Sequence, residues 1–241
     1  MRSLHVLTRK EDLDPRQIAD KIVIVLDVLF ATSTIVTALE HGAREVIPAV
    51  DEAAARAQAL QYPAGSAVLA GEQHANRIAG FAPYAPLALA DSGLEGKHLL
   101  YTTTNGTVAL RQAENARHVY VAALLNAEAV AARVRDHHGD DSVLILCAGS
   151  IGMLNLEDFY AAGALIERLL STAPSGCLVS DAAIAAQGLY RHYGVEGAQS
   201  CLLRSRVGKM MMERGLIHEV RFAAELDRYA RVPALCEGRI R

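Results

Sequence analysis

Three short segments of this chain place carboxylates, hydroxyls and glycines directly after apolar runs. Asp27 ends the apolar run in VLDVLFATST, and TTTNGT at residues 102–107 follows a second run. The third segment, CAGSIGMLNLEDFYAAG at residues 147–163, carries both hydroxyl and acidic side chains. In an open parallel sheet, ligands bind beyond the carboxyl ends of the strands, where loops lead into helices. We therefore expect the three segments to meet at one site.

The TTTNGT segment stands where a helical pattern begins, a position that suits an anion such as phosphate. Unpaired backbone N–H groups and the helix dipole both favour negative charge at a helix N-terminus. A glycine there allows close backbone approach, and the neighbouring side chains add donors. The residues expected to bind phosphate are Thr103, Thr104, Asn105, Gly106 and Thr107, together with Gly149 and Ser150 of the third segment. The alternative is that these residues are ordinary helix N-caps.

Carboxylates beside a phosphate site indicate a hard divalent metal. Mg²⁺ prefers oxygen ligands and usually joins one or two carboxylates to phosphate oxygens. The expected metal ligands are Asp27, Glu72 in LAGEQ, Glu157 and Asp158. Asp27, Glu157 and Asp158 are also the catalytic candidates. Because Glu157 and Asp158 are adjacent, they diverge by about 100° on a helix, and only one is expected to face the metal directly. Alternatively, this acidic pair stabilises the start of its helix.

The elements that must position these groups alternate between short strands and helices. Six apolar runs rich in β-branched residues are too short for helices and predict strands buried on both faces, at 21–29, 44–50, 66–71, 97–103, 118–124 and 142–149. Helical patterns lie between or after them, at 32–41, 52–61, 107–114, 127–136 and 158–170. This alternation predicts an α/β fold with a largely parallel or mixed sheet and helices on its faces.

The last third of the chain differs, because its patterns are mainly helical. Those at 180–193, 205–215 and 217–227 predict three helices that cover the sheet as a cap or an outer layer. Two earlier segments, 37–50 and 109–123, share a helix end followed by an A-R-x-V step into a strand. They are either duplicated strand–helix–strand units or similar by chance in an Ala-rich sequence.

Composition limits the class of protein. The 241 residues can bury a substantial core and are expected to form a single domain over 1–241, with a subdivision near 125–140 as the alternative. A hydrophobic share of 51% is globular, and a net charge of −3 without basic clusters argues against nucleic acid. No apolar run approaches the roughly 20 residues that span a bilayer, and residues 1–14 lack the apolar core of a signal peptide. We therefore expect a cytoplasmic protein, and its Ala-rich helices are compatible with a homodimer.

The segments, taken in order, resemble the 2-phosphosulfolactate phosphatase family, enzymes of coenzyme M biosynthesis and their bacterial relatives. DVLFATSTIVTAL resembles the family pattern D-V-L-R-A-T-[ST]-T, and AGEQ resembles A-G-E-R. The likeness continues through TTNGTVAL, LLNAEAVA, LEDFYAAG and DAAIAAQGLY to SRVGKMMMERGLIHEVRFAAELD, which matches S-x-x-G-[RK]. The similarity runs along nearly the whole chain.

This resemblance implies a three-layer α/β/α fold, Mg²⁺, and a small phosphorylated acid as substrate. The implied reaction is hydrolysis of the phosphate monoester 2-phosphosulfolactate to 3-sulfolactate and phosphate. The resemblance also implies Lys209, at the family's Arg/Lys position, as a further substrate-binding cation.

The chain departs from the family pattern at three places. Phe30 stands where the family has Arg, Gln73 stands where it has the Arg of G-E-R, and GFAPYAPLAL at 80–89 replaces G-F-D-x-G-N-S-P. Guanidinium groups are natural bidentate partners of phosphate, sulfonate and carboxylate. The resemblance therefore implies either a phosphatase with a less anionic substrate or an inactive relative that binds a small anion or a protein partner. A Phe30 side chain that lines a roomy, electropositive cleft favours the first, and one that fills the pocket favours the second.

Overall fold

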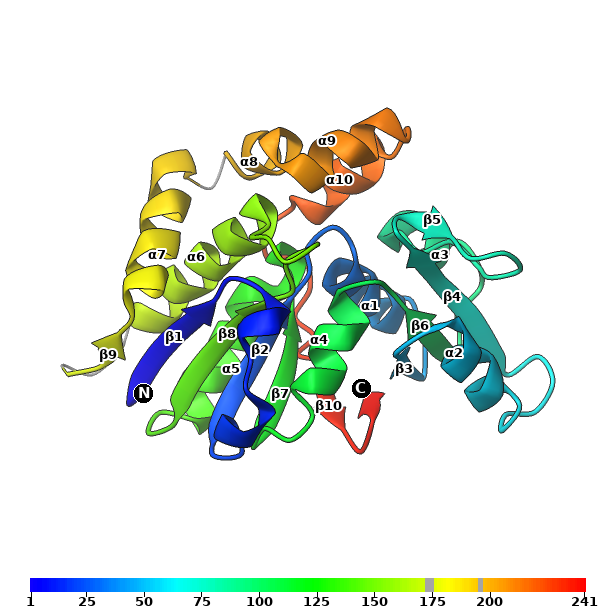
Figure 1. Ribbon diagram of the computed structural model, residues 1–241, viewed down its shortest axis with the longest axis horizontal. Helices are drawn as coiled ribbons and strands as arrows, with labels where there is room; N and C mark the ends of the chain where they lie inside the picture. Colours follow the sequence, from blue (N-terminus) through cyan, green and yellow to red (C-terminus); the bar gives the residue numbers. More distant parts are fainter. Residues whose placement is uncertain (172–175, 195–196) are drawn as a thin grey trace.

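The computed structural model describes residues 1–171, 176–194 and 197–241, and one mixed β-sheet runs through this part (Figure 1). Its strands are β1 (Ser3–Leu7), β2 (Lys21–Leu26), β3 (Glu45–Ala49), β4 (Ala67–Gln73), β5 (Asn76–Arg77), β6 (His98–Thr102), β7 (His118–Ala122), β8 (Ser142–Cys147), β9 (Leu178–Val179), β10 (Ala234–Cys236) and β11 (Arg239–Ile240). They lie in the order β5-β4-β6-β3-β11-β10-β7-β2-β8-β1-β9. All six predicted strands are present.

The sheet consists of two parallel blocks joined by the C-terminal hairpin. β4, β6 and β3 pair parallel in one block, and β7, β2, β8, β1 and β9 pair parallel in the other. β10 and β11 pair antiparallel with each other, and also with β7 and β3 respectively. The sheet is therefore largely parallel within its blocks and mixed as a whole.

Helices cover both faces of the sheet, which gives a three-layer α/β fold. They are α1 (Ala31–Glu40), α2 (Glu52–Ala59), α3 (Pro86–Ala90), α4 (Gly106–Gln112), α5 (Ala127–His137), α6 (Leu156–Leu170), α7 (Asp181–Tyr193), α8 (Ala198–Arg204), α9 (Arg206–Glu213) and α10 (Ile217–Ala223). In Figure 1, α2 and α4 lie in front of the sheet and α1 and α5 behind it, while α8, α9 and α10 lie across one end. In the described residues, no helix has the length and apolar character needed to cross a membrane.

The central strands form because their side chains are apolar on both faces. In β2, every residue from Ile22 to Leu26 is fully buried. Ile24 pairs with Tyr120 of β7 on one side and with Ile145 of β8 on the other. A β-branched run of this kind suits a strand covered by helices on both faces, and it places Asp27 at a defined point just beyond the strand end.

Seven short elements were not predicted from the sequence: β1, β5, β9, β10, β11, α3 and α8. Most of these elements are too short to produce a recognisable period, and the two hairpin strands have three and two residues. Their pairing depends on a two-residue turn in which Glu237 and Gly238 have φ values of 51° and 74°. Such turns need positive φ at both central residues, which glycine adopts readily.

The two similar segments, 37–50 and 109–123, occupy equivalent places around this hairpin. Each continues from a helix, α1 or α4, into a strand that borders the hairpin: β3 pairs with β11, and β7 pairs with β10. The strand before each helix, β2 or β6, lies in the opposite block. This placement supports two related units, β2-α1-β3 and β6-α4-β7.

Candidate active site

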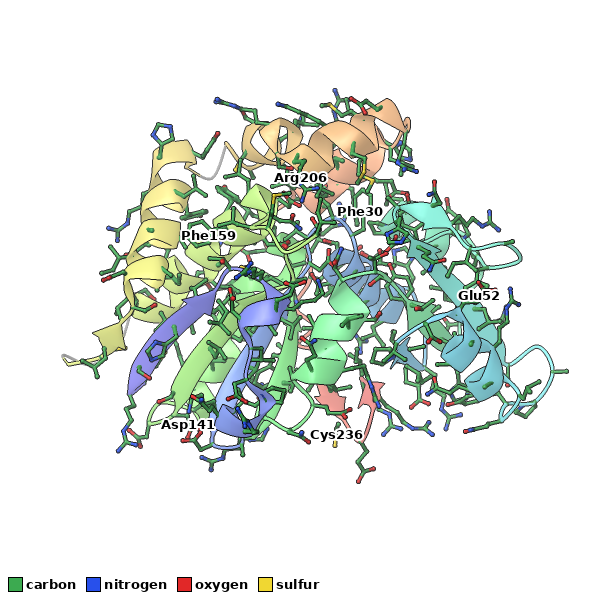
Figure 2. All side chains as sticks on the ribbon, in the orientation of Figure 1. Phe30, Glu52, Asp141, Phe159, Arg206 and Cys236 are labelled. Atoms are coloured by element: carbon green, nitrogen blue, oxygen red, sulfur yellow. The ribbon has the colours of Figure 1, made fainter. Side chains whose placement is uncertain are left out.

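A cleft of about 210 Å³ lies where the ends of four strands meet α9. Asp27 reaches it after β2, Glu72 from β4, Thr103 after β6 and Ser150 after β8, so the three polar segments do come together. Its lining residues are Asp27, Leu29, Phe30, Ala31, Glu72, His74, Ala75, Tyr84, Tyr101, Thr103, Thr104, Asn105, Ser150, Ile151, Asn155, Arg206, Val207, Met210 and Met211. Figure 2 shows two of these side chains, Phe30 and Arg206, at the underside of α9.

Asp27 lies at the floor of the cleft and is 7% exposed. Its backbone N–H donates to Thr32 Oγ1 at 3.1 Å, which fixes the turn into α1. Burial, together with the nearby charges of Glu72 and Glu157, raises the pKa of the Asp27 carboxyl to about 7, partly opposed by the charge of Lys10. A carboxylate in this position favours a bound cation, because it is desolvated and surrounded by other acidic groups.

Glu157 and Asp158 are both buried at the start of α6, beneath the cleft rather than on its surface. The Asp158 carboxylate accepts a hydrogen bond from Val28 N at 2.8 Å and one from Asn155 Nδ2 at 3.3 Å. It therefore holds the loop that carries Asp27. In contrast, Glu157 Oε2 is buried and has no hydrogen-bond partner among the described residues. Burial raises the pKa of both carboxyls, and for Asp158 the charge of Glu157 adds to it.

Glu72 lines the cleft and connects two of its loops. One carboxylate oxygen accepts from Thr104 N at 2.6 Å, and the other accepts from Ala75 N and from Thr104 Oγ1. His74 N also donates to Thr104 Oγ1, at 2.8 Å. These bonds join the turn between β4 and β5 to the TTTNGT loop, so Glu72 is engaged by protein donors on both oxygens.

The TTTNGT loop supplies cleft residues and a helix cap. Thr103, Thr104 and Asn105 line the cleft, whereas Gly106 and Thr107 do not. Thr107 N donates to Thr103 Oγ1 at 3.0 Å, and Thr103 N donates to Thr107 Oγ1 at 2.9 Å. The two hydroxyls thus bond to each other's backbone N–H groups at the start of α4, whereas Asn105, the residue at the N-cap position, makes no side-chain cap hydrogen bond.

Of the remaining predicted phosphate ligands, Ser150 lines the cleft, but Gly149 and Lys209 do not. Gly149 has φ +62°, and a Cβ there would lie 2.8 Å from Arg9 Cβ and 2.7 Å from Met153 O. Its glycine is thus required by packing of the loop. Lys209 is exposed on α9 and is not among the residues that line the cleft.

Arg206, at the first turn of α9, is the guanidinium that reaches the cleft. It donates to Ser150 Oγ and, at 3.1 Å, to Asn155 Oδ1, while Ser150 Oγ donates to Asn155 Oδ1 at 2.7 Å. Through Asn155 this network continues to Asp158. The sequence analysis missed Arg206 although it lies inside the SRVGK motif, and the spacing of three residues to Lys209 does not decide which side chain turns inward.

Other residues of the site also escaped the sequence analysis. Lys10 is 8% exposed, and its Nζ donates to Asn105 Oδ1 at 2.8 Å. His74 lines the cleft from the turn between β4 and β5, Tyr84 from the loop before α3, and Tyr101 from β6. The sequence carries no local signal for these contacts, because each partner lies far along the chain.

The donor chemistry at the cleft fits Mg²⁺. In the ranges the structure describes, no three His, Cys, Asp or Glu side chains are arranged as a complete metal site. Mg²⁺ commonly takes one or two carboxylates and completes its shell with water and substrate oxygens. Asp27 at the floor, with the unpaired Glu157 Oε2 nearby, fits that smaller set. Glu72 and Asp158 already accept hydrogen bonds through both of their oxygens.

Phe30 forms part of the cleft wall and leaves the cleft open. The side chain is 4% exposed, and its ring centroid lies 6.5 Å from that of Tyr84. About 210 Å³ of space remains with Phe30 in place. Phe30 therefore lines the cleft and does not fill it, but the cleft is not the electropositive one expected, because its lining holds two carboxylates, Asp27 and Glu72, and one guanidinium, Arg206.

Gly106→Ala is expected to lower both stability and activity. A Cβ at position 106 would lie 2.3 Å from Ala31 Cβ and 2.7 Å from Asp27 Oδ2. The start of α4 would have to move away from Asp27, at a cost of about 1–3 kcal/mol. Denaturant unfolding and turnover of the same samples measure both effects. Gly188→Ala is the matched control, because a Cβ in that helix position meets nothing within 4 Å. It is expected to be neutral or stabilising; equal behaviour of the two variants would contradict this explanation.

The known proteins that this chain resembles share one family name. Residues 7–238 match the family model described as 2-phosphosulpholactate phosphatase. A protein of Symbiobacterium thermophilum named probable 2-phosphosulfolactate phosphatase is 35% identical over 93% of this chain and 95% of its own length. Proteins with the same name from Deinococcus radiodurans and Caldanaerobacter subterraneus are 37% and 32% identical, over 94% and 95% of this chain and 92% and 93% of their own.

Proposed function

Because this chain belongs to the 2-phosphosulfolactate phosphatase family, we propose that it is a Mg²⁺-dependent phosphatase acting on the phosphate monoester of a small hydroxy acid. The compound in the relatives' names, 2-phosphosulfolactate, is the reference member of this class, and its hydrolysis would give 3-sulfolactate and phosphate. Family membership supports the reaction class, and the geometry of the cleft supports the roles of its side chains.

The observation that carries the proposal is that Asp27 and Arg206 line the same cleft. A buried carboxylate suits a divalent cation, and a guanidinium suits the oxygens of a phosphate. A phosphate group between them would be held by the cation on one side and by Arg206 on the other. This combination is typical of phosphoryl transfer, where positioning and charge stabilisation supply most of the rate.

The side chains of the cleft divide into binding and positioning groups. Arg206 and Ser150 would bind phosphate oxygens, with Thr103, Thr104 and Asn105 as further donors. Asp27 would hold Mg²⁺, with Glu157 behind it; Mg²⁺, when bound, polarises the phosphoryl group and orients an attacking water.

The positioning groups act through these residues. Asp158 holds the backbone at Val28, and thereby the loop that carries Asp27, while Glu72 holds Thr104.

The experiment that tests the function is phosphate release from phosphorylated 2-hydroxy acids, with Mg²⁺ and with a chelator. We expect release in Mg²⁺, little or none in chelator, and recovery when Mg²⁺ is restored. Release that is unchanged by the chelator would refute the metal role. Folded protein that releases no phosphate but binds a non-hydrolysable phosphonate would instead indicate the non-catalytic, anion-binding alternative.

A further inference from the structure

The cleft has a polar end, at Arg206, Ser150 and Asn155, and an end lined mainly by aromatic rings and methionines beside Glu72, which we call the apolar end; α9 spans both. At its first turn, Arg206 bonds to Ser150 and Asn155 of the loop after β8. At its C-terminal end, Arg214 donates to Ala75 O at 2.7 Å and to Asn76 Oδ1 at 2.9 Å, in the turn between β4 and β5. α9 is therefore fixed to loops from the two blocks of the sheet and crosses the cleft between them.

The middle of α9 contributes only apolar side chains to this cleft. Val207, Met210 and Met211 line it between the two arginine anchors. Since a helix rises about 1.5 Å per residue, Met210 and Met211 lie roughly 6–8 Å farther along the helix than Arg206. They are displaced towards the end where Tyr84 and Ala75 lie, away from the guanidinium.

The two tyrosines at that end contribute their rings to the cleft, because their hydroxyls are hydrogen-bonded to the backbone. Tyr84 OH donates to Ala75 O at 3.0 Å, and Tyr101 OH donates to Tyr84 O at 2.6 Å. With both hydroxyls bonded to backbone carbonyls, the two tyrosines offer ring surface to the cleft beside Phe30. Leu29 and Ala31 add to the same apolar lining.

The polar side chains near the apolar end offer little to bind a second acidic group of a substrate. Glu72 is acidic and already accepts hydrogen bonds on both oxygens. His74 is exposed to solvent at the turn. By contrast, the donors Arg206, Ser150, Asn155 and Asn105 belong to the other end or to the loop after β6. Arg214 also lies at this end, but it is outside the cleft lining and donates to Ala75 O and Asn76 Oδ1. A negatively charged substituent among the rings would therefore lose its hydration without a guanidinium in the lining to bind it.

We propose that the substrate is a 2-hydroxy acid phosphate whose third substituent is apolar, an alkyl group or an aromatic ring, instead of a second acid. Its phosphate and carboxylate occupy the polar end, and the apolar substituent lies against Phe30, Tyr84, Met210 and Met211. The cleft volume of about 210 Å³ limits that substituent to a small group. This inference rests on the proposed phosphatase function and specifies its substrate class.

Three esters that differ only at one carbon test the inference: the phosphates of lactate, 3-phenyllactate and 3-sulfolactate. We expect the phenyl compound to have a kcat/KM about 10- to 100-fold above that of the methyl compound, and the sulfonate to be the poorest. The inference is overturned if the sulfonate compound is the best substrate of the wild-type protein.

Matched variants on α9 locate the preference. Met210→Arg adds a cation at the apolar end and is expected to lower kcat/KM for the phenyl compound at least 10-fold while raising that for the sulfonate at least 10-fold. Met212→Arg makes the same change on the same helix at a residue outside the cleft lining, and the order of the three esters should not change. Identical effects of the two variants on the order of the three esters would refute a role for Met210 in substrate preference.

A binding measurement separates this inference from the proposed function. The three non-hydrolysable phosphonate analogues are titrated into the protein by calorimetry, with circular dichroism to verify folding of each variant. If no ester is hydrolysed but the phenyl phosphonate binds most tightly, the phosphatase proposal fails and the apolar preference stands. If phosphate is released but the sulfonate binds and reacts best, the phosphatase proposal stands and this inference fails. If none of the phosphonates binds, the inference fails.

Discussion

Asp27→Asn is expected to reduce Mg²⁺-dependent phosphate release by at least ~10³-fold while leaving the protein folded. The substitution keeps the size of the side chain and removes the charge that a divalent cation requires. Asp27 lines the cleft, whereas the other two catalytic candidates, Glu157 and Asp158, lie beneath it. Steady-state turnover and calorimetric titration of Mg²⁺ into the variant measure the effect.

Asp140→Asn is the matched control for this substitution. Asp140 is exposed in the loop between α5 and β8 and is not part of the cleft lining. The control is expected to keep wild-type turnover and Mg²⁺ binding. An Asp27→Asn protein that turns over substrate at the wild-type rate would show that the cation, if used, is held elsewhere.

The same variant also has a stability signature in the presence of chelator. A carboxyl whose pKa is raised in the folded protein, here from 3.8 to about 7, binds its proton more tightly when folded than when unfolded. The free energy of unfolding therefore falls as pH rises from about 4 to about 7. Asparagine cannot ionise, so Asp27→Asn should lose less stability over this range, although Glu157 and Asp158 contribute a decline in the same direction. Equal pH slopes of the two proteins would contradict the buried charge of Asp27.

The second large effect is expected for Arg206→Ala, which should lower kcat/KM by about 10- to 100-fold. A charge-assisted hydrogen bond to a phosphate contributes about 1.5–3 kcal/mol, and Arg206 is the guanidinium that lines the cleft. The loss should appear mainly in KM if Arg206 binds the ground state, and in kcat if it stabilises charge in the transition state. Initial rates over a range of substrate concentrations distinguish the two.

Two further variants decide whether position 206 itself matters. Arg204→Ala removes an exposed arginine at the end of the preceding helix and should have no effect beyond about 2-fold. Lys209→Ala tests the cation that the family pattern indicates. If Lys209→Ala weakens substrate binding and Arg206→Ala does not, the sequence-based assignment is right and the role given to Arg206 is wrong.

The order and type of the main elements follow from local sequence. Apolar β-branched runs such as 21–29 and 142–149 produce buried strands because both of their faces are covered, and this depends on the composition of the run itself. The convergence of Asp27, Thr103 and Ser150 also follows, because each stands just after a strand. The short hairpin β10–β11 could not be predicted in the same way, because five residues in two strands carry too little periodicity.

Sequence by itself therefore determined where the main strands lie, which loops reach the site, and which carboxylates and hydroxyls those loops carry. Tertiary structure alone decided which of these groups face the cleft. Asp158 is bonded to Val28 across 130 positions, Glu72 to Thr104 across 32, and Arg206 to Asn155 across 51. The physical reason is that each polar atom bonded to a protein partner is no longer free for a ligand, as for both carboxylate oxygens of Glu72 and Asp158, whereas Arg206 uses Nη2 in its bonds; these partners come from distant strands and helices.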